Sequence, residues 1–465
     1  MKILLTHAYY LNEDPKELLI MKPYVPLGIL YIAAYLEEHN FANEVFDATF
    51  SDFDSHCKKL LELKPDVVAV YTNLMTKLNV LRLIRFIKSE PSLKHTKVIL
   101  GGPEVRHHAG NFLDHGADFI VMGEGEETML ELVKAIADKK ENFSTINGIG
   151  FILGEEQIFN ESRNNIRDIN SLPFPARKKV NLQLYFDAWK DRHGESAVSV
   201  STMRGCPYTC KWCSRAVYGQ SYRRRSAALV AKELQWIQEN YKVDTVWFVD
   251  DVFTISHKWL AEFNDELKKI NLKVKYECIT RADRMNEEVL RLLKETGCYR
   301  VWIGAESGSQ KIIDAMDRRV DVKQVREMIR KSKDYGIQSG TFIMIGYPGE
   351  TEADLVETLN HLKSSDPDYY TITVAYPIKG TPLYIETEPD FTIKPAWDEG
   401  TDRQIDFKRN YSRKYYDYAI RWIYNEMALH KNNVNKGPFL KSAKHAVKAA
   451  AARGVMTLVR IGNPT

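Results

Sequence analysis

The sequence is poor in cysteine and carries little net charge. Only six of its 465 residues are cysteine, too few for a disulfide framework. Its 65 lysines and arginines nearly balance 62 acidic residues, so the net charge of +3 does not indicate a nucleic-acid-binding protein. No apolar run reaches the roughly 18 to 20 residues of a membrane-spanning helix, and the first ten residues are typical of a buried strand rather than a secretory signal. We expect a cytoplasmic protein that binds no nucleic acid.

The first 145 residues alternate short β-rich runs with amphipathic helical stretches. Such alternation is typical of a doubly wound, Rossmann-like parallel sheet, which binds ligands beyond the carboxyl ends of its strands. A chain of 465 residues is also too long for one compact core, so further domains are expected. The expected strands of this first domain lie at residues 2–8, 44–50, 66–72, 97–102 and 118–124.

The remaining sequence divides into three parts. Residues 146–194 contain a hairpin pattern followed by an extended linker, because Pro173 and Pro175 forbid a continuous helix. From 195 to 385 the alternation of strand and helix restarts with six strands, which predicts a partial (β/α)6 barrel with its chemistry at the strand ends. Residues 386–465 predict a helical, basic extension. The fold class is therefore α/β, with two domains and a C-terminal helical extension.

Three of the six cysteines lie within eight residues, on the loop after the first barrel strand. Cys206, Cys210 and Cys213 form the spacing C-x3-C-x2-C. Three thiolates can bind three irons of a 4Fe-4S cluster and leave the fourth iron open for a small molecule. The alternative is a zinc site, which needs a fourth ligand, and no histidine lies between Met203 and His257. The spacing favours the iron-sulfur cluster.

This motif, with an aromatic residue before its third cysteine, resembles that of the radical S-adenosylmethionine (SAM) superfamily. The resemblance covers roughly residues 195–385. It implies that the amino and carboxylate groups of SAM chelate the open iron. One-electron reduction then yields methionine and a 5′-deoxyadenosyl radical that abstracts hydrogen. The resemblance also implies the residues that contact SAM, namely Trp212, Asp250, Asp251, Arg281, Glu306, Ser307, Gly346, Tyr376 and Pro377.

Of these, the Glu306-Ser307-Gly308 segment is the most specific. The resemblance implies that Glu306 accepts hydrogen bonds from the ribose hydroxyls of SAM and that Ser307 contacts SAM. The alternative interpretation is a helix N-cap at Ser307 or Ser309 with a solvated Glu306. Two other residue sets also have alternative interpretations. Asp250 and Asp251, at the end of the second strand, could belong to a plain turn, and Arg281, at the end of the third, could form a surface ion pair.

The first domain resembles the cobalamin-binding domain of one branch of this superfamily, which includes class B methyltransferases and the anaerobic magnesium-protoporphyrin cyclase. The segments that carry the resemblance are PLGILYIAAYLEEHN, VYTNL, VILGGPEV and VMGEGEET. They imply cobalamin contacts at Thr72, Asn73, Leu74, Gly101, Gly102 and Glu124. The D-x-H-x-x-G cobalt-ligand motif is absent after the first strand, since the Asp54-Ser55-His56 segment lies in a later helix and lacks the glycine. Cobalamin would bind without histidine on cobalt; the alternative is a Rossmann-like domain with no cofactor.

Together these resemblances imply a cobalamin-dependent radical SAM enzyme that methylates an unactivated carbon. The first alternative is a radical SAM cyclase, oxidase or dehydratase without methyl transfer. The second, of another class, is a non-enzymatic iron-sulfur sensor. The implied partners are a small-molecule, lipid or pigment substrate and an electron donor such as flavodoxin or ferredoxin.

Two further features concern the rest of the chain. Cys57, Cys278 and Cys298 are scattered and are expected to be small buried hydrophobic side chains. Residues 436–465 contain lysine and arginine but no acid, since the last acidic residue is Glu426. This pattern predicts a basic amphipathic helix, which either contacts an anionic membrane surface or packs on the barrel with a solvated basic face.

Overall fold

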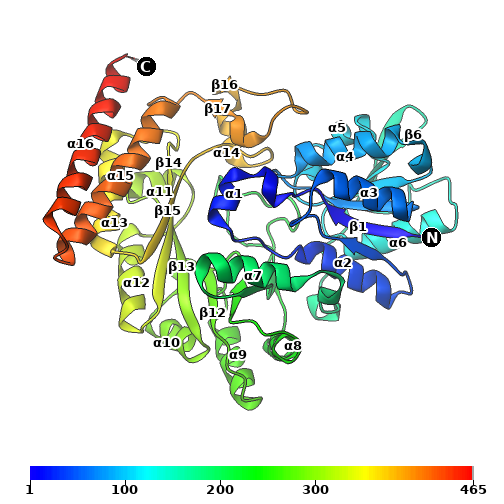
Figure 1. The fold of residues 1–465 in the computed structure, drawn as a ribbon, viewed down its shortest axis with the longest axis horizontal. Coiled ribbons are helices and arrows are strands. Elements are labelled where there is room, and N and C mark those ends of the chain that lie inside the picture. Colours follow the sequence, from blue (N-terminus) through cyan, green and yellow to red (C-terminus); the bar gives the residue numbers. More distant parts are fainter. Residues whose placement is uncertain (463–465) are drawn as a thin grey trace. The chain divides into compact units, whose positions relative to one another are not determined.

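The computed structural model describes residues 1–462, which form two compact units. The first unit comprises Met1–Pro207, Ser214–Val249 and Pro395–Thr401. The second comprises Tyr208–Cys213, Asp250–Lys394 and the chain from Asp402 onward. Both units contain helices and parallel strands (Figure 1). Each unit comprises three separate segments of the chain. The α/β class predicted from the sequence is confirmed.

The first unit is built on a seven-stranded sheet in the order β2-β1-β3-β4-β5-β6-β7. Five strands are parallel: β1 (Ile3–His7), β2 (Glu44–Phe46), β3 (Val67–Tyr71), β4 (Lys97–Gly101) and β5 (Phe119–Val121). Strands β6 (Ile149–Leu153) and β7 (Glu156–Phe159) form an antiparallel hairpin that pairs with β5. The hairpin predicted between domains is therefore real, and it extends the first sheet instead of standing apart from it.

Helices cover both faces of this sheet, as in a doubly wound fold. One apolar core lies beneath α3 (Phe53–Leu63), α4 (Lys77–Ser89) and α5 (Ala109–Asp114). A second lies beneath α2 (Leu27–Glu38) and α6 (Glu126–Ala137). The strands supply apolar side chains to both cores because buried parallel strands face protein on both sides. A short helix, α1 (Pro15–Ile20), precedes α2.

The first unit also holds the beginning of the barrel region. Helix α7 (Leu182–His193) lies within the predicted linker, which is thus not extended throughout. Strands β8 (Ala197–Val200) and β11 (Thr245–Phe248) pair in parallel, and α8 (Ala227–Asn240) connects them. Between these strands, β9 (Met203–Arg204) and β10 (Arg223–Arg224) form a short antiparallel pair.

The second unit contains four parallel strands in sequential order. They are β12 (Tyr276–Thr280), β13 (Cys298–Glu306), β14 (Gln338–Ile345) and β15 (Tyr369–Val374). Helices alternate with them: α9 (His257–Lys269), α10 (Glu287–Glu295), α11 (Gln310–Ala315), α12 (Val322–Asp334), α13 (Glu352–Ser365) and α14 (Pro382–Thr387). With β8 and β11, the six predicted barrel strands are all present.

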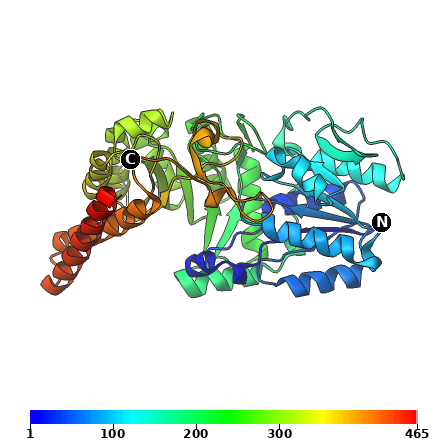
Figure 2. The ribbon, with the colours of Figure 1, turned by 90° about the horizontal axis from the view of Figure 1, so that it is seen from above.

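The C-terminal region is helical, as predicted. After the small pair β16 (Phe391–Ile393) and β17 (Asp406–Phe407), the long helices α15 (Arg413–Val434) and α16 (Phe439–Gly462) lie side by side in both views (Figures 1 and 2). The Arg460 guanidinium donates to Glu352 Oε2 over 2.8 Å, and Arg453 pairs with the same carboxylate, so α16 is held to α13. Within residues 1–462, no helix is both long and apolar enough to cross a bilayer.

Candidate active site

The second half of the cysteine loop is tied to the second unit by its own backbone. Lys211 N donates to Met316 O over 3.1 Å, and Leu383 N donates to Lys211 O over 3.0 Å. Of the three cysteines, Cys210 is buried, Cys206 is half-buried and Cys213 is exposed. Among residues 1–462, no three His, Cys, Asp or Glu side chains gather closely enough to hold a single metal ion. A 4Fe-4S cluster does not need such a gathering, since each thiolate binds its own iron.

Two buried arginines converge on Cys210. Arg281 Nη1 and Arg318 Nη1 each donate to Cys210 Sγ over 3.7 Å. Both guanidiniums are fixed by further contacts, because Arg281 Nη2 donates to Arg318 O over 2.7 Å and Arg318 Nη2 donates to Gly304 O over 3.1 Å. The Arg281 guanidinium also stacks on the Tyr208 ring, 3.7 Å from its centroid. The buried sulfur of Cys210 therefore accepts from two cationic side chains.

Glu306 lies beside this arginine pair in a strained backbone position. It has a φ of +63°, and the pairing of β13 with β14 shifts register between Gly304 and Glu306. A positive φ is costly for a residue with a Cβ, and such strain concentrates at functional sites. Burial raises the pKa of the Glu306 carboxyl, and Arg318, 3.7 Å from its Oε1, partly offsets that effect. The strain turns this carboxylate toward the same arginine that contacts the thiol.

The donor set around Cys210 fits an anionic, thiolate-ligated cluster. Burial lowers the pKa of Arg318, but Glu306 and the Cys210 thiolate more than compensate, so the guanidinium stays charged. Cys278 shows the opposite environment, because burial and the neighbouring Cys298 raise the pKa of its thiol well above the usual value. The contrast separates a cysteine that faces two guanidiniums from one that is buried beside a second thiol and two carboxyl groups. The cysteines outside the motif are buried, as expected.

The other residues predicted to contact SAM differ in burial. Trp212 packs on the apolar cluster of Ile312, Met316, Tyr347, Ala375 and Leu383. Asp250 is buried, whereas Asp251 is exposed. Tyr376 is half-buried and Pro377 is buried, directly after β15.

Ser307 and Gly308 have structural roles toward α13. Ser307 Oγ lies 3.2 Å from Thr358 Oγ1, and Gly308 N donates to the same hydroxyl over 3.0 Å. A Cβ at Gly308 would lie 2.5 Å from Glu357 O, so glycine is needed for packing on α13. Ser309 is the N-cap residue of α11, without a hydrogen bond from its side chain to the helix, and its N–H donates to Ser307 Oγ over 3.2 Å. A direct contact of Ser307 with SAM stays a prediction.

The loop after β14 is organised by a buried carboxyl group. Gly346 has a φ of +74°, its N–H donates to Glu350 Oε2 over 2.6 Å, and its carbonyl accepts from Arg409 Nε over 3.0 Å. Glu350 is completely buried, and its other oxygen has no hydrogen-bond partner among the described residues. Burial raises the pKa of Glu350 to about 8, so this carboxyl is protonated near neutral pH.

This carboxyl predicts a pH dependence of stability. Because its pKa in the folded chain exceeds its ordinary value of about 4.3, the unfolded chain loses the proton first as pH rises. The contribution is complete at acidic pH and is lost between about pH 4.5 and 8. Between pH 6 and 8 the unfolding free energy should fall by about 2 to 3 kcal/mol more in the parent chain than in Glu350→Gln. Denaturant unfolding at both pH values measures this difference, and an equal pH dependence in the two proteins would refute it.

In the first unit, the predicted cobalamin residues meet at the carboxyl ends of β3 and β4. Thr72 N donates to Gly101 O over 2.7 Å, and Asn73 Oδ1 accepts from Thr76 N over 3.0 Å at the turn before α4. Gly102 has a φ of +106°, and a Cβ there would lie 2.5 Å from Thr72 O. This packing already requires the glycine, whatever ligand lies beyond it. Leu74 is half-buried in the same turn.

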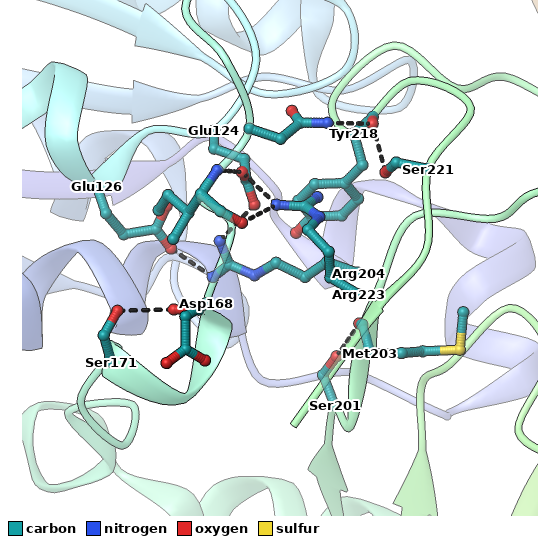
Figure 3. Close-up of polar contacts among 12 residues, drawn as sticks. Glu124, Glu126, Asp168, Ser171, Ser201, Met203, Arg204, Tyr218, Ser221 and Arg223 are labelled. Atoms are coloured by element: carbon teal, nitrogen blue, oxygen red, sulfur yellow. Dashed lines mark hydrogen bonds and ion pairs between the residues drawn. The ribbon is translucent and has the colours of Figure 1, made fainter. Parts of the chain in front are cut away.

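Glu124 is at the centre of a buried ionic network (Figure 3). Arg204 Nη1 donates to Glu124 Oε1 over 2.9 Å, and Arg223 Nη1 donates to Oε2 over 2.6 Å. The backbone N–H of Ile166 donates to Oε2 over 2.6 Å, and Arg204 Nη2 donates to Glu126 Oε1 over 2.5 Å. Both Glu124 oxygens are thus used within the protein. The network joins the loop after β5 to β9. Its Arg204 lies in β9, two residues before Cys206.

A matched variant in a second buried ion-pair group separates the effect of Glu124 on stability from its effect on activity. Glu233 is also buried between two arginines, since Arg177 lies 2.8 Å from it and Arg225 is its other partner. Removing one charge of such a buried group should lower the unfolding free energy by about 3 kcal/mol in both Glu124→Gln and Glu233→Gln. Only Glu124→Gln should also slow 5′-deoxyadenosine formation, by about tenfold, because its partner Arg204 precedes Cys206. Equal rates in the two variants would contradict this difference.

Three residues of the site, Arg318, Tyr208 and Arg204, were not predicted from the sequence. Arg318 follows α11 and is not at a strand end, and its neighbour Arg319 is an exposed arginine paired with Asp317, so the sequence does not single it out. Tyr208 lies within the motif and Arg204 two residues before it, and this closeness is the signal that could have identified them. His56 lies in α3, with its ring nitrogens 3.2 Å from Thr6 Oγ1 and 2.9 Å from Tyr10 Oη.

Comparisons with known proteins agree with this architecture. Residues 200–362 match the model of the radical SAM superfamily, and residues 21–133 match that of the B12 binding domain. An uncharacterized methyltransferase of Pyrococcus horikoshii is 28% identical over 77% of this chain and 77% of its own length. The anaerobic magnesium-protoporphyrin IX monomethyl ester cyclase of Cereibacter sphaeroides is 27% identical over 83% of this chain and 63% of its own.

A solved structure shares the fold. It is that of the radical SAM methyltransferase TsrM from Kitasatospora setae, with cobalamin and a 4Fe-4S cluster bound. The TM-score is 0.68 at 17% identity, over 83% of this chain and 74% of that one.

These findings define an enzyme in which a B12-binding domain precedes a radical SAM domain. In sequence the chain thus combines a region that matches the radical SAM superfamily with a preceding region that matches the B12 binding domain.

Proposed function

We propose that this enzyme is a cobalamin-dependent radical SAM methyltransferase that methylates an unactivated carbon of a small molecule. The observation that carries the proposal is the presence of both domains in one chain, with a buried cysteine of the C-x3-C-x2-C motif held between two arginines. The Pyrococcus horikoshii relative, named as a methyltransferase, supports the same reaction.

The cysteine loop and the arginines of the second unit suggest how the cluster is held. Cys206, Cys210 and Cys213 would ligate three irons, and the guanidiniums of Arg281 and Arg318 would balance the negative charge of the thiolates. When bound, the cluster with SAM would supply a carbon-centred radical, and cobalamin would supply the methyl group. Glu306, which ends β13 beside Arg318, would accept a hydrogen bond from a ribose hydroxyl of SAM.

The contacts of the other groups follow from the same placement. Cobalamin would lie over the carboxyl ends of β3 and β4, near Thr72, Asn73, Leu74, Gly101 and Gly102. Glu124 would support that site through Arg204 and Arg223 without touching the cofactor. An electron donor such as flavodoxin or ferredoxin would reduce the cluster, and the substrate would be a lipid, a pigment or another small molecule.

A second candidate function is a radical cyclisation or oxidation without methyl transfer. The observation that favours it is the 27% identity with the anaerobic cyclase over 83% of this chain. The two functions differ in what they consume, because only methyl transfer converts SAM into S-adenosylhomocysteine.

The test uses the full chain, reconstituted anaerobically with iron, sulfide and cobalamin, and SAM labelled in its methyl group. Incubated with dithionite and a panel of lipid and pigment extracts, a methyltransferase forms both 5′-deoxyadenosine and S-adenosylhomocysteine and moves the label into an extract component. Formation of a modified product with 5′-deoxyadenosine alone would reject the methyltransferase in favour of the second candidate. Omitting cobalamin is the matched control, and it should abolish label transfer.

A further inference from the structure

Helix α16 exposes large apolar side chains on the face that points away from the protein. Phe439, Leu440, Val447 and Leu458 are between 69% and 82% exposed. At 3.6 residues per turn they fall within an arc of about 100°. The opposite face carries Ala449, Ala452 and Met456, which are buried. The helix is thus packed through small residues and presents its larger apolar residues to the surroundings.

Lysines adjoin this apolar stripe on one flank. Lys441, Lys444 and Lys448 are exposed, and Lys436 is exposed in the turn before the helix. No acidic residue follows Glu426, so the described part of α16 has no internal partner for these charges. Arg453 and Arg460 differ, because both pair with Glu352 on α13 and hold the helix in place. The lysine charge is therefore available to an external partner.

The chemistry of this face determines which partner fits it. An apolar stripe bordered by lysines matches an anionic lipid surface, where the apolar side chains enter the acyl boundary and the lysines meet the phosphates. A second copy of the same face would bring lysine against lysine, and like charges disfavour such contact. An apolar groove beside the turn between α15 and α16, lined by Leu429, Lys436, Phe439, Ala443 and Ala446, continues the stripe at its end.

We propose that α16 docks on an anionic membrane surface and lies in its plane. Phe439 and Leu440 anchor the beginning of the helix, and Val447 and Leu458 extend the contact along its length. Contacts of α16 with α13 and α15 hold the second unit at the membrane. The inference stands independently of the reaction that the enzyme catalyses.

Flotation of the full chain with two kinds of vesicle tests this surface. One vesicle is phosphatidylcholine alone, and the other contains equal parts of phosphatidylcholine and phosphatidylglycerol. We expect binding to the anionic vesicles only. Neutralising Lys441, Lys444 and Lys448 to glutamine should lower the partition coefficient by about 100-fold, because each lysine near such a surface contributes about fivefold. Phe439→Ser with Leu440→Ser should lower it by at least about tenfold.

A control pair and a second serine pair show whether the loss of vesicle binding is specific to the apolar face of α16. Leu19→Ser with Ile385→Ser removes two apolar side chains that are 69% and 68% exposed elsewhere, and it should leave binding unchanged. Val447→Ser with Leu458→Ser tests the same stripe if the first pair fails to fold by circular dichroism. Equal binding to both vesicles, binding to neither, or unchanged binding of both serine pairs would overturn the proposal. So would a dimer, measured by light scattering, that the serine pairs dissociate.

Discussion

Replacing Cys210 with alanine is expected to abolish formation of 5′-deoxyadenosine, a loss of at least about 1,000-fold. Cys210 is the buried cysteine of the motif, and Arg281 and Arg318 both donate to its sulfur. Alanine removes one of three thiolates and leaves both guanidiniums facing a methyl group. Iron content after anaerobic reconstitution, together with the rate of dithionite-driven SAM cleavage, measures the effect.

Cys278→Ala is the control for the loss of a buried thiol. Its side chain is fully buried in β12, and burial raises the pKa of its thiol, so the thiol stays protonated. This variant should retain iron and SAM cleavage, with only a modest loss of stability from the smaller side chain. If Cys210→Ala retained iron and activity as well as Cys278→Ala does, the assignment of the cluster ligands would be wrong.

Arg318→Met should slow SAM cleavage by about 10- to 100-fold, the usual cost of losing a group that supports a metal ligand. Methionine preserves much of the volume but removes the charge that faces both Cys210 and Glu306. Glu306 then has one cation fewer in a buried position, so its pKa should rise further. The reduction potential of the cluster should become more negative, because a nearby positive charge stabilises the reduced, more anionic form.

The neighbouring arginine gives a matched control. Arg319 is exposed, and its guanidinium forms an ion pair with Asp317, the residue before Arg318. Arg319→Met should leave the rate and the potential unchanged, since an exposed ion pair contributes little. Arg318→Lys, which keeps the charge but loses the forked geometry, should recover part of the potential shift. Equal potentials in the Arg318→Met and Arg319→Met proteins would show that Arg318 has a packing role only.

The alternation of strand and helix was enough to predict both α/β regions, because buried parallel strands and their covering helices leave a strong period in the sequence. The helical extension was equally predictable from its apolar spacing. The position of the hairpin at residues 149–159 was not, since the same alternating pattern suits an isolated hairpin and an added edge of a sheet. Helix α7 within the predicted linker was not predicted either. Pro173 and Pro175 indicate an extended chain, but they precede the amphipathic run that forms the helix.

The candidate site was predictable only where its residues are close in sequence. The cysteine spacing and the Glu306 segment are local patterns. The convergence of Arg281 and Arg318 on Cys210 joins residues that are 71 and 108 positions away from it, and no local pattern records such a meeting. Glu124 is a similar case, because the sequence does not indicate that the distant Arg204 and Arg223 bind its oxygens, and its contact with cobalamin stays a prediction.

The most direct test of the central claim is the low-temperature electron paramagnetic resonance spectrum of the dithionite-reduced, reconstituted chain, recorded with and without SAM. An open iron in a cluster held by Cys206, Cys210 and Cys213 predicts a 4Fe-4S signal that changes when SAM is added, in a protein that also retains cobalamin. A chain that yields no iron-sulfur signal, or a signal that SAM leaves unchanged, would contradict the account.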